Sequence, residues 1–223
     1  MECTVETFSS NGHVEILGIS DNVHIPFPHC VSISLTYPPY FDSGIQAQIA
    51  NAAKQAIQAV GLRDGTAHIE ILMTRDGHVL VELAARGGGY RIFSDILREI
   101  SGVDPVDAVL DVALGRAPAI EPTRSRAAVL RFFNPPGSGI LRAIHGLENA
   151  RRLPGVFALA IEAELGQEFH GITRDGERPG YTIVTGDTRE DAIAVADQVE
   201  RLVRFDFDAV ATRHQPTMNA RTS

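Results

Sequence analysis

The sequence has 223 residues, a formal net charge of −8 at pH 7 and a hydrophobic fraction of 44%, which is typical of a globular protein and excludes a disordered chain. The negative charge and the lack of a Lys/Arg cluster argue against a nucleic-acid-binding surface, and two cysteines are too few for a disulfide framework. No apolar run approaches the ~20 residues of a membrane span, and no targeting signal is visible, so we expect a cytoplasmic protein.

The chain begins with a predicted hairpin, in which residues 4–8 and 13–20 are strands on either side of an Asn11-Gly12 turn. Residues 21–42 follow; they are rich in proline and are predicted to be irregular. A helix is predicted from Ser43, which forms a capping box with Gln46, and it ends at Gly61.

Three potential zinc ligands, His24, His29 and Cys30, lie in the proline-rich segment. Structural zinc sites usually have four ligands in closely spaced pairs. These three residues lack that spacing, so we interpret them as ordinary loop residues.

A second hairpin is predicted between Thr66 and Gly89, because two runs of alternating apolar residues flank Arg75-Asp76-Gly77. A three-residue loop pairs Thr74 with His78 and places Glu70 opposite Glu82. A two-residue loop would put the two glutamates on opposite faces. With the longer loop, one face carries His68, Glu70, Leu72, Leu80, Glu82, Ala84 and Arg86, and the other carries Ile69, Ile71, Met73, Val79, Val81 and Leu83.

Two carboxylates directly opposite each other, with Cβ atoms ~5 Å apart, repel and destabilise a strand pair. The arrangement is favourable if a hard cation lies between Glu70 and Glu82, since Mg2+ commonly binds one or two carboxylates together with substrate phosphates. The alternative is a solvated sheet face without a metal. His68 shares this face and would contact a substrate or orient a carboxylate, or have no role.

The hairpin runs into a glycine-rich turn, Arg86 to Arg91, which can present backbone N–H groups to an anion but is not a P-loop. Two helices follow. The first is predicted over residues 92–100 and the second begins at Asp104-Pro105, with Val106, Val109, Leu110, Ala113 and Leu114 facing inward to cover the hairpin sheet.

The pattern changes after residues 118–126, which read as a linker. Short strands are predicted at 127–133, 139–144, 156–162, 169–172 and 181–185, with a last helix capped by Thr188 and Asp191. We therefore expect a first domain at 1–117, a small α+β domain at 127–205 and a solvated tail at 206–223.

At the second hairpin the sequence resembles the ATP-grasp carboxylate–amine ligases. Members of the amino-acid-ligase branch carry a His-x-Glu strand and a Glu-x-Ala-x-Arg-x-Gly-Gly strand, and this sequence has both, at residues 68–70 and 82–89. The resemblance covers residues 2–205. It implies an α+β fold: the C-terminal part of the ATP-grasp antiparallel sheet with packing helices, then a small α+β domain.

The resemblance also implies roles and partners. Glu70 and Glu82 would hold Mg2+ on the phosphates of ATP, Arg86 would stabilise an acyl-phosphate, and Gly88 and Gly89 would lie against the substrate. Many ATP-grasp enzymes have Asn where Ala84 stands, which removes one metal ligand here.

Relative to the family, the chain would be the C-terminal half of a ligase, without the N-terminal domain and the first ATP-binding subdomain. We expect an ATP- and Mg2+-dependent ligase, or its C-terminal half, that joins a small-molecule carboxylate to an amine. The alternatives are a non-catalytic ATP-grasp remnant or partner subunit, whose N-terminal sheet edge pairs with a companion chain, and a metal-binding hairpin protein without nucleotide.

Overall fold

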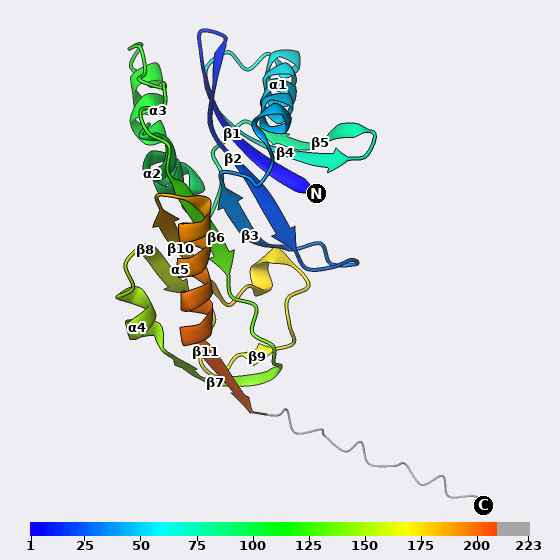
Figure 1. Ribbon diagram of the computed structural model, residues 1–223, viewed down its shortest axis with the longest axis vertical. Coiled ribbons are helices and arrows are strands. Elements are labelled where there is room, and N and C mark those ends of the chain that lie inside the picture. Colours follow the sequence, from blue (N-terminus) through cyan, green and yellow to red (C-terminus); the bar gives the residue numbers. More distant parts are fainter. Residues whose placement is uncertain (209–223) are drawn as a thin grey trace, which may run out of the picture.

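The computed structural model describes residues 1–208, and the expected α+β architecture is confirmed (Figure 1). Its strands are β1 (Glu2–Ser10), β2 (His13–His24), β3 (Ser32–Tyr37), β4 (Gly65–Thr74), β5 (Gly77–Ala84), β6 (Ala127–Phe132), β7 (Gly139–His145), β8 (Val156–Ile161), β9 (Glu168–Phe169), β10 (Gly180–Gly186) and β11 (Arg204–Asp208). An eight-stranded sheet has the order β5-β4-β1-β2-β3-β6-β10-β8, and a three-stranded sheet has the order β11-β7-β9. All their pairings are antiparallel.

Five α-helices pack around the sheets, together with a π-helical turn, η1 (Ile92–Ile96), and a 3-10 turn, η2 (Asp175–Glu177). They are α1 (Ser43–Val60), α2 (Leu97–Ser101), α3 (Pro105–Ala113), α4 (Leu147–Arg151) and α5 (Arg189–Leu202). Figure 1 shows α1 on one side of the large sheet and α2 and α3 on the other. No helix among residues 1–208 has the length and apolar character needed to cross a membrane.

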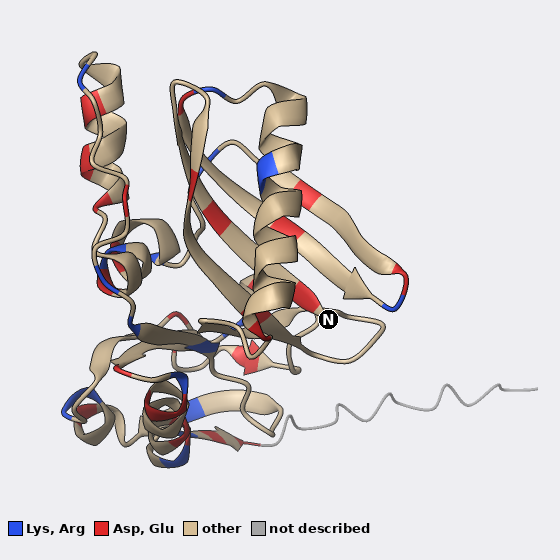
Figure 2. Ribbon diagram, turned by 45° about the horizontal axis from the view of Figure 1, so that its top comes forward, with Lys and Arg blue, Asp and Glu red and all other residues tan. Residues whose placement is uncertain are grey.

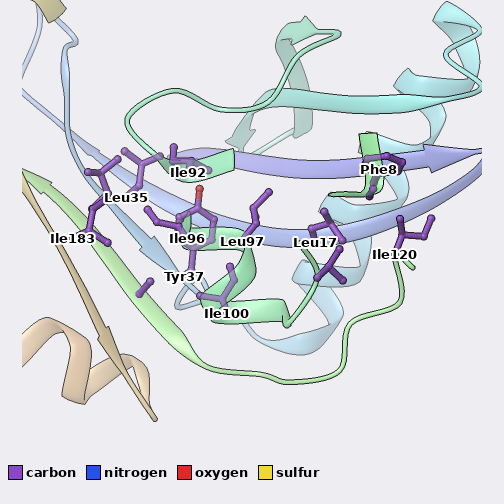
Figure 3. Close-up of a cluster of buried hydrophobic side chains, with 14 of the residues drawn as sticks. Phe8, Leu17, Leu35, Tyr37, Ile92, Ile96, Leu97, Ile100, Ile120 and Ile183 are labelled. Atoms are coloured by element: carbon purple, nitrogen blue, oxygen red, sulfur yellow. The ribbon is translucent and has the colours of Figure 1, made fainter. Parts of the chain in front are cut away.

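The two faces of β1 have different surroundings because successive side chains point to opposite sides of a strand. Cys3 and Val5 pack with β4 against α1. Phe8 points to the other face, into the cluster drawn in Figure 3, where η1 and α2 contribute Ile96, Leu97 and Ile100. The remaining side chains on that second face of β1 are polar, and they form the floor of the site described below.

Several predicted elements are confirmed. The first hairpin turns at Asn11 and Gly12, both with positive φ, and α1 ends at Gly61 in the left-handed conformation. The helix cap, however, is Asp42, whose carboxylate accepts from the Ile45 N–H, and not the predicted Ser43. At α5 the predicted capping box of Thr188 and Asp191 is present.

The prediction that residues 21–42 are irregular is confirmed for 25–31 and 38–42 but is wrong for 21–24 and 32–37. β2 continues to His24, and Ser32–Tyr37 forms β3, a central strand that pairs with both β2 and β6. The prolines that suggested a loop flank β3 and do not interrupt it, so they do not remove any of its ladder hydrogen bonds.

The inward face predicted for the second helix is also wrong. In α3 only Pro105 and Ala108 are buried, whereas Val106, Val109, Leu110 and Leu114 are 37% to 62% exposed. The helix packs on the rest of the described chain through Pro105, Ala108 and Val112, so the predicted apolar stripe is left uncovered by residues 1–208.

The predicted linker, residues 118–126, contains no strand, but the regions before and after it share one continuous sheet, because β3 and β6 pair directly. A buried ion pair adds to this connection: Arg189 at the start of α5 donates to both carboxylate oxygens of Asp21 on β2, at 2.6 and 3.0 Å. Residues 206–208, predicted as tail, belong to β11; the rest of the predicted tail, 209–223, lies outside the described residues.

The N-terminal strand is not the open sheet edge that the alternative of a partner subunit requires. β1 is paired on both sides, with β2 and with β4. The outer strands of the large sheet are β5 and β8, and β5 carries Val79, Leu80 and Val81 at 49% to 53% exposure.

Candidate functional site

The candidate site is the polar face shared by β1, β4 and β5. The ladders place Thr4 opposite Glu70 and Glu6 opposite His68, and on the next strand Glu70 lies opposite Glu82. β1, β2, β4 and β5 contain acidic residues but no Lys or Arg, and Figure 2 shows this acidic character on the sheet. Such a surface favours a cation.

The register of the second hairpin is confirmed at the two glutamates, although the predicted loop is wrong. Thr74 pairs with Gly77 and not with His78, so the loop has two residues. The register then shifts between Glu70 and Ile71, where Val81 is the extra residue on β5. This bulge compensates for the shorter loop, because one added residue returns Glu82 to the face of Glu70.

On β4, His68 lies between the carboxylates of Glu6 and Glu70. Its Nδ1 is 2.5 Å from Glu6 Oε1 and its Nε2 is 3.5 Å from Glu70 Oε1. Burial alone would lower the pKa of His68, but the hydrogen bonds to Glu6 and Glu70 raise it to about 9. His68 is therefore an imidazolium at neutral pH, and it partly neutralises the fully buried Glu6.

Glu6 also holds the glycine-rich turn. Its Oε2 accepts from the Gly88 N–H at 3.3 Å, and a Cβ at position 88 would overlap Glu6 Oε1. One buried carboxylate thus fixes both the imidazolium of His68 and the loop that follows Arg86. Glycine at 88 is explained by this close approach.

A cavity of about 460 Å³ opens above this face. Glu2 and Glu70 line it from β1 and β4, which form its acidic side, and Arg86 and Arg178 line it from the segments that follow β5 and η2. Further lining residues are Thr4, Asn22, His24, Cys30, Ser32, Leu35, His68, Gly89, Tyr90, Ile92, Leu130, Phe132 and Asp175.

The cavity brings together four of the residues predicted from sequence: His68, Glu70, Arg86 and Gly89. Gly88, in the same turn as Gly89, is not in the lining; its N–H donates to Glu6. Glu82 lies beside the cavity and not in its lining; its Oε1 is 3.7 Å from Arg86 Nη2, and about half of its side chain is exposed.

Glu2 and His24 were missed as site residues. His24 Nε2 lies 3.1 Å from Glu2 Oε1, and this hydrogen bond lowers the pKa of the Glu2 carboxyl. Asn22 donates to the same oxygen at 3.1 Å and to Thr4 Oγ1 at 2.8 Å. In the sequence, polar residues alternate along the first strand. This pattern predicts a strand with one polar face but does not identify the face as part of a site.

The donor set at Glu70 and Glu82 fits Mg2+. Within residues 1–208 no three His, Cys, Asp or Glu side chains are arranged to hold a metal ion together. Two adjacent, partly exposed carboxylates suffice for Mg2+, which keeps water and phosphate oxygens in its remaining positions. His24, one of the three potential zinc ligands, is instead hydrogen-bonded to Glu2.

The Glu6–His68 pair makes folding stability pH-dependent. Because the pKa of His68 is raised to about 9 from 6.5, its stabilisation is complete below pH 6.5 and is lost as the pH rises through about 9. We expect the free energy of unfolding to fall by roughly 2–3 kcal/mol over that range, measured by urea unfolding. The exposed His13 (68%) provides the control: His13→Gln should keep the profile, His68→Gln should flatten it. A flat wild-type profile would contradict the assignment.

Comparisons with known proteins agree with the fold. Residues 131–208 match the family described as L-amino acid ligase C-terminal domain 2. The structure is similar to L-amino acid ligase from Bacillus licheniformis, with a TM-score of 0.82 and 22% identity over 93% of this chain and 54% of that chain. It is also similar to phosphoribosylglycinamide synthetase from Anaerococcus prevotii, with a TM-score of 0.80 and 15% identity over 93% of this chain and 53% of that one.

In sequence, the chain is 34% identical to human carnosine synthase 1 over 109 residues, which are 49% of this chain and 13% of that protein. The chain spans about half the length of the two similar structures and a smaller part of carnosine synthase.

Proposed function

We propose that this chain supplies the metal-binding and acyl-transfer part of an ATP- and Mg2+-dependent carboxylate–amine ligase. The proposal rests on its ATP-grasp fold, which is similar to that of an L-amino acid ligase. The observation that carries this proposal is the pairing of Glu70 with Glu82 beside Arg86, next to a cavity that Glu2, Glu70, Arg86 and Arg178 line.

In this reaction a carboxylate oxygen attacks the γ-phosphorus of ATP and ADP leaves. An amine nitrogen then attacks the acyl carbon, phosphate leaves, and the amine loses a proton. Glu70 and Glu82 would hold Mg2+, which neutralises charge on the phosphates. Arg86 would bind the oxygens of the transferring phosphoryl group, and the protonated His68 adds a second positive charge behind Glu70.

The second candidate function is a subunit that needs a companion chain to bind ATP, and one feature favours this partner-dependent hypothesis. Lys54 is the only lysine in the sequence, and it lies on α1, which packs against the opposite face of the sheet. Lysines that would hold the α- and β-phosphates are therefore absent from the polar face. We expect little ATP turnover by this chain alone and more when a companion chain supplies those groups.

The experiment uses ATP, Mg2+ and a pool of amino acids labelled with 18O in the carboxylate. Transfer of 18O to phosphate, together with ADP release, is expected for an acyl-phosphate route. It is measured for the chain alone and with the product of the adjacent upstream reading frame. ADP release with unlabelled phosphate would contradict the ligase proposal. Strong ATP turnover by the chain alone would contradict the partner-dependent hypothesis.

A further inference from the structure

The cavity contains a buried arginine that the proposed chemistry does not use. Arg178 follows η2 and lines the cavity, and only 4% of its side chain is exposed. Its guanidinium lies over the ring of Phe132, 4.0 Å from the centroid, and 5.4 Å from that of Tyr90. A cation so deeply buried needs polar partners, because the loss of hydration is expensive.

The described residues give Arg178 few such partners. Nη2 donates to Asp175 Oδ1 at 2.7 Å, which is the one hydrogen bond of the guanidinium within residues 1–208. Nε is buried and has no hydrogen-bond partner. A guanidinium has five N–H donors in a planar fork, so most of its capacity to bind an anion is unused.

The residues around Arg178 indicate which kind of anionic ligand the cavity can bind. Asp175, which also lines the cavity and is 72% exposed, accepts from Nη2 and leaves Nε of the guanidinium without a carboxylate partner. The acidic residues of the cavity, Glu2 and Glu70, are on β1 and β4, which β2 and β3 separate from β6, where Phe132 packs against Arg178. A ligand that satisfies both the guanidinium and these carboxylates carries a negative group at one end and an ammonium or amine at the other.

We propose that Arg178 binds the carboxylate of the amine substrate, so that this substrate is an amino acid held with its nitrogen toward the acidic side of the cavity. This inference rests on the proposed function. A carboxylate matches the planar fork and forms two parallel charge-assisted hydrogen bonds. Anchored on Arg178, this carboxylate is kept away from phosphoryl transfer, and the amine is left free to attack.

The test is binding by calorimetry without nucleotide, using the full chain and each of the twenty L-amino acids. The tightest binder is compared with its carboxamide, which keeps the amine and loses the negative charge. We expect the carboxamide to bind about 10- to 100-fold more weakly. Arg178→Gln should weaken amino-acid binding by a similar factor and leave carboxamide binding unchanged.

Arg174→Gln is the matched control, because Arg174 lies in the same turn with 79% of its side chain exposed; it should bind as the wild type does. Urea unfolding of each variant separates a binding role from a structural one. If Arg178→Gln does not fold, Arg178→Lys keeps the charge without the fork, and an intermediate loss of affinity is expected.

The proposal is overturned if no amino acid binds, if the carboxamide binds equally well, if Arg178 variants that fold retain full affinity, or if inorganic phosphate is the only anion whose binding depends on Arg178. Since no ATP is present, failure here is distinguishable from failure of the 18O-transfer experiment, which tests the ligase reaction itself.

Discussion

Glu82→Ala is expected to reduce ADP release by about 10³-fold in the active enzyme, with or without a companion chain. Glu82 and Glu70 face each other across the ladder, and a metal held by both loses one of its two protein ligands when Glu82 is removed. Stability should be unchanged or slightly higher. Glu82 is about half exposed and leaves no cavity, and its removal relieves the repulsion between the two carboxylates.

The control for this prediction is Asp76→Ala, which removes an exposed carboxylate from the turn of the same hairpin. It should retain ADP release and the urea-unfolding midpoint of the wild type. Full activity of Glu82→Ala would remove Glu82 from the mechanism. Equal losses in both variants would indicate that the conformation of the hairpin, and not the metal ligand, had been disturbed.

The sequence predicts the existence of the second hairpin correctly, but it does not predict the length of its loop or its bulge. The reason is physical. Apolar alternation determines register only where one face is buried, and β5 is an outer strand with most of its side chains exposed. Its alternation therefore carries no information on which of Val79, Leu80 or Val81 faces inward, and a bulge can form there without loss of core packing. The Glu70–Glu82 pairing was predicted from a loop that the structure does not have.

The residues that complete the site could not be found from sequence because their partners are distant in the chain. Glu6 meets His68 across 62 positions through the pairing of β1 with β4. Arg178 lies in a polar turn whose composition suggests exposure, and it packs against the aromatic rings of Tyr90 and Phe132, which are distant in the chain. Local motifs identified the hairpin; the supporting contacts depend on tertiary structure.

Glu6 is the position where loss of a single carboxylate should affect both stability and the site. Glu6→Ala leaves the buried imidazolium of His68 and the Gly88 N–H without their partner. Breaking one side of a buried ion pair typically lowers the free energy of unfolding by about 3–5 kcal/mol. We expect a loss of that size by urea unfolding at pH 7, and the protonated state of His68 should become less favourable.

Two further variants separate the causes. Glu6→Gln keeps the volume and the acceptor for Gly88 but removes the charge, so it should be destabilised less than Glu6→Ala and should lose most of the fall in stability between pH 6.5 and about 9 that His68 otherwise produces. Adding His68→Gln to Glu6→Ala should recover part of the lost stability, because no buried charge then remains unpaired. If Glu6→Ala is as stable as the wild type, or if the double variant loses the sum of the two single effects, Glu6 and His68 do not act as a coupled pair.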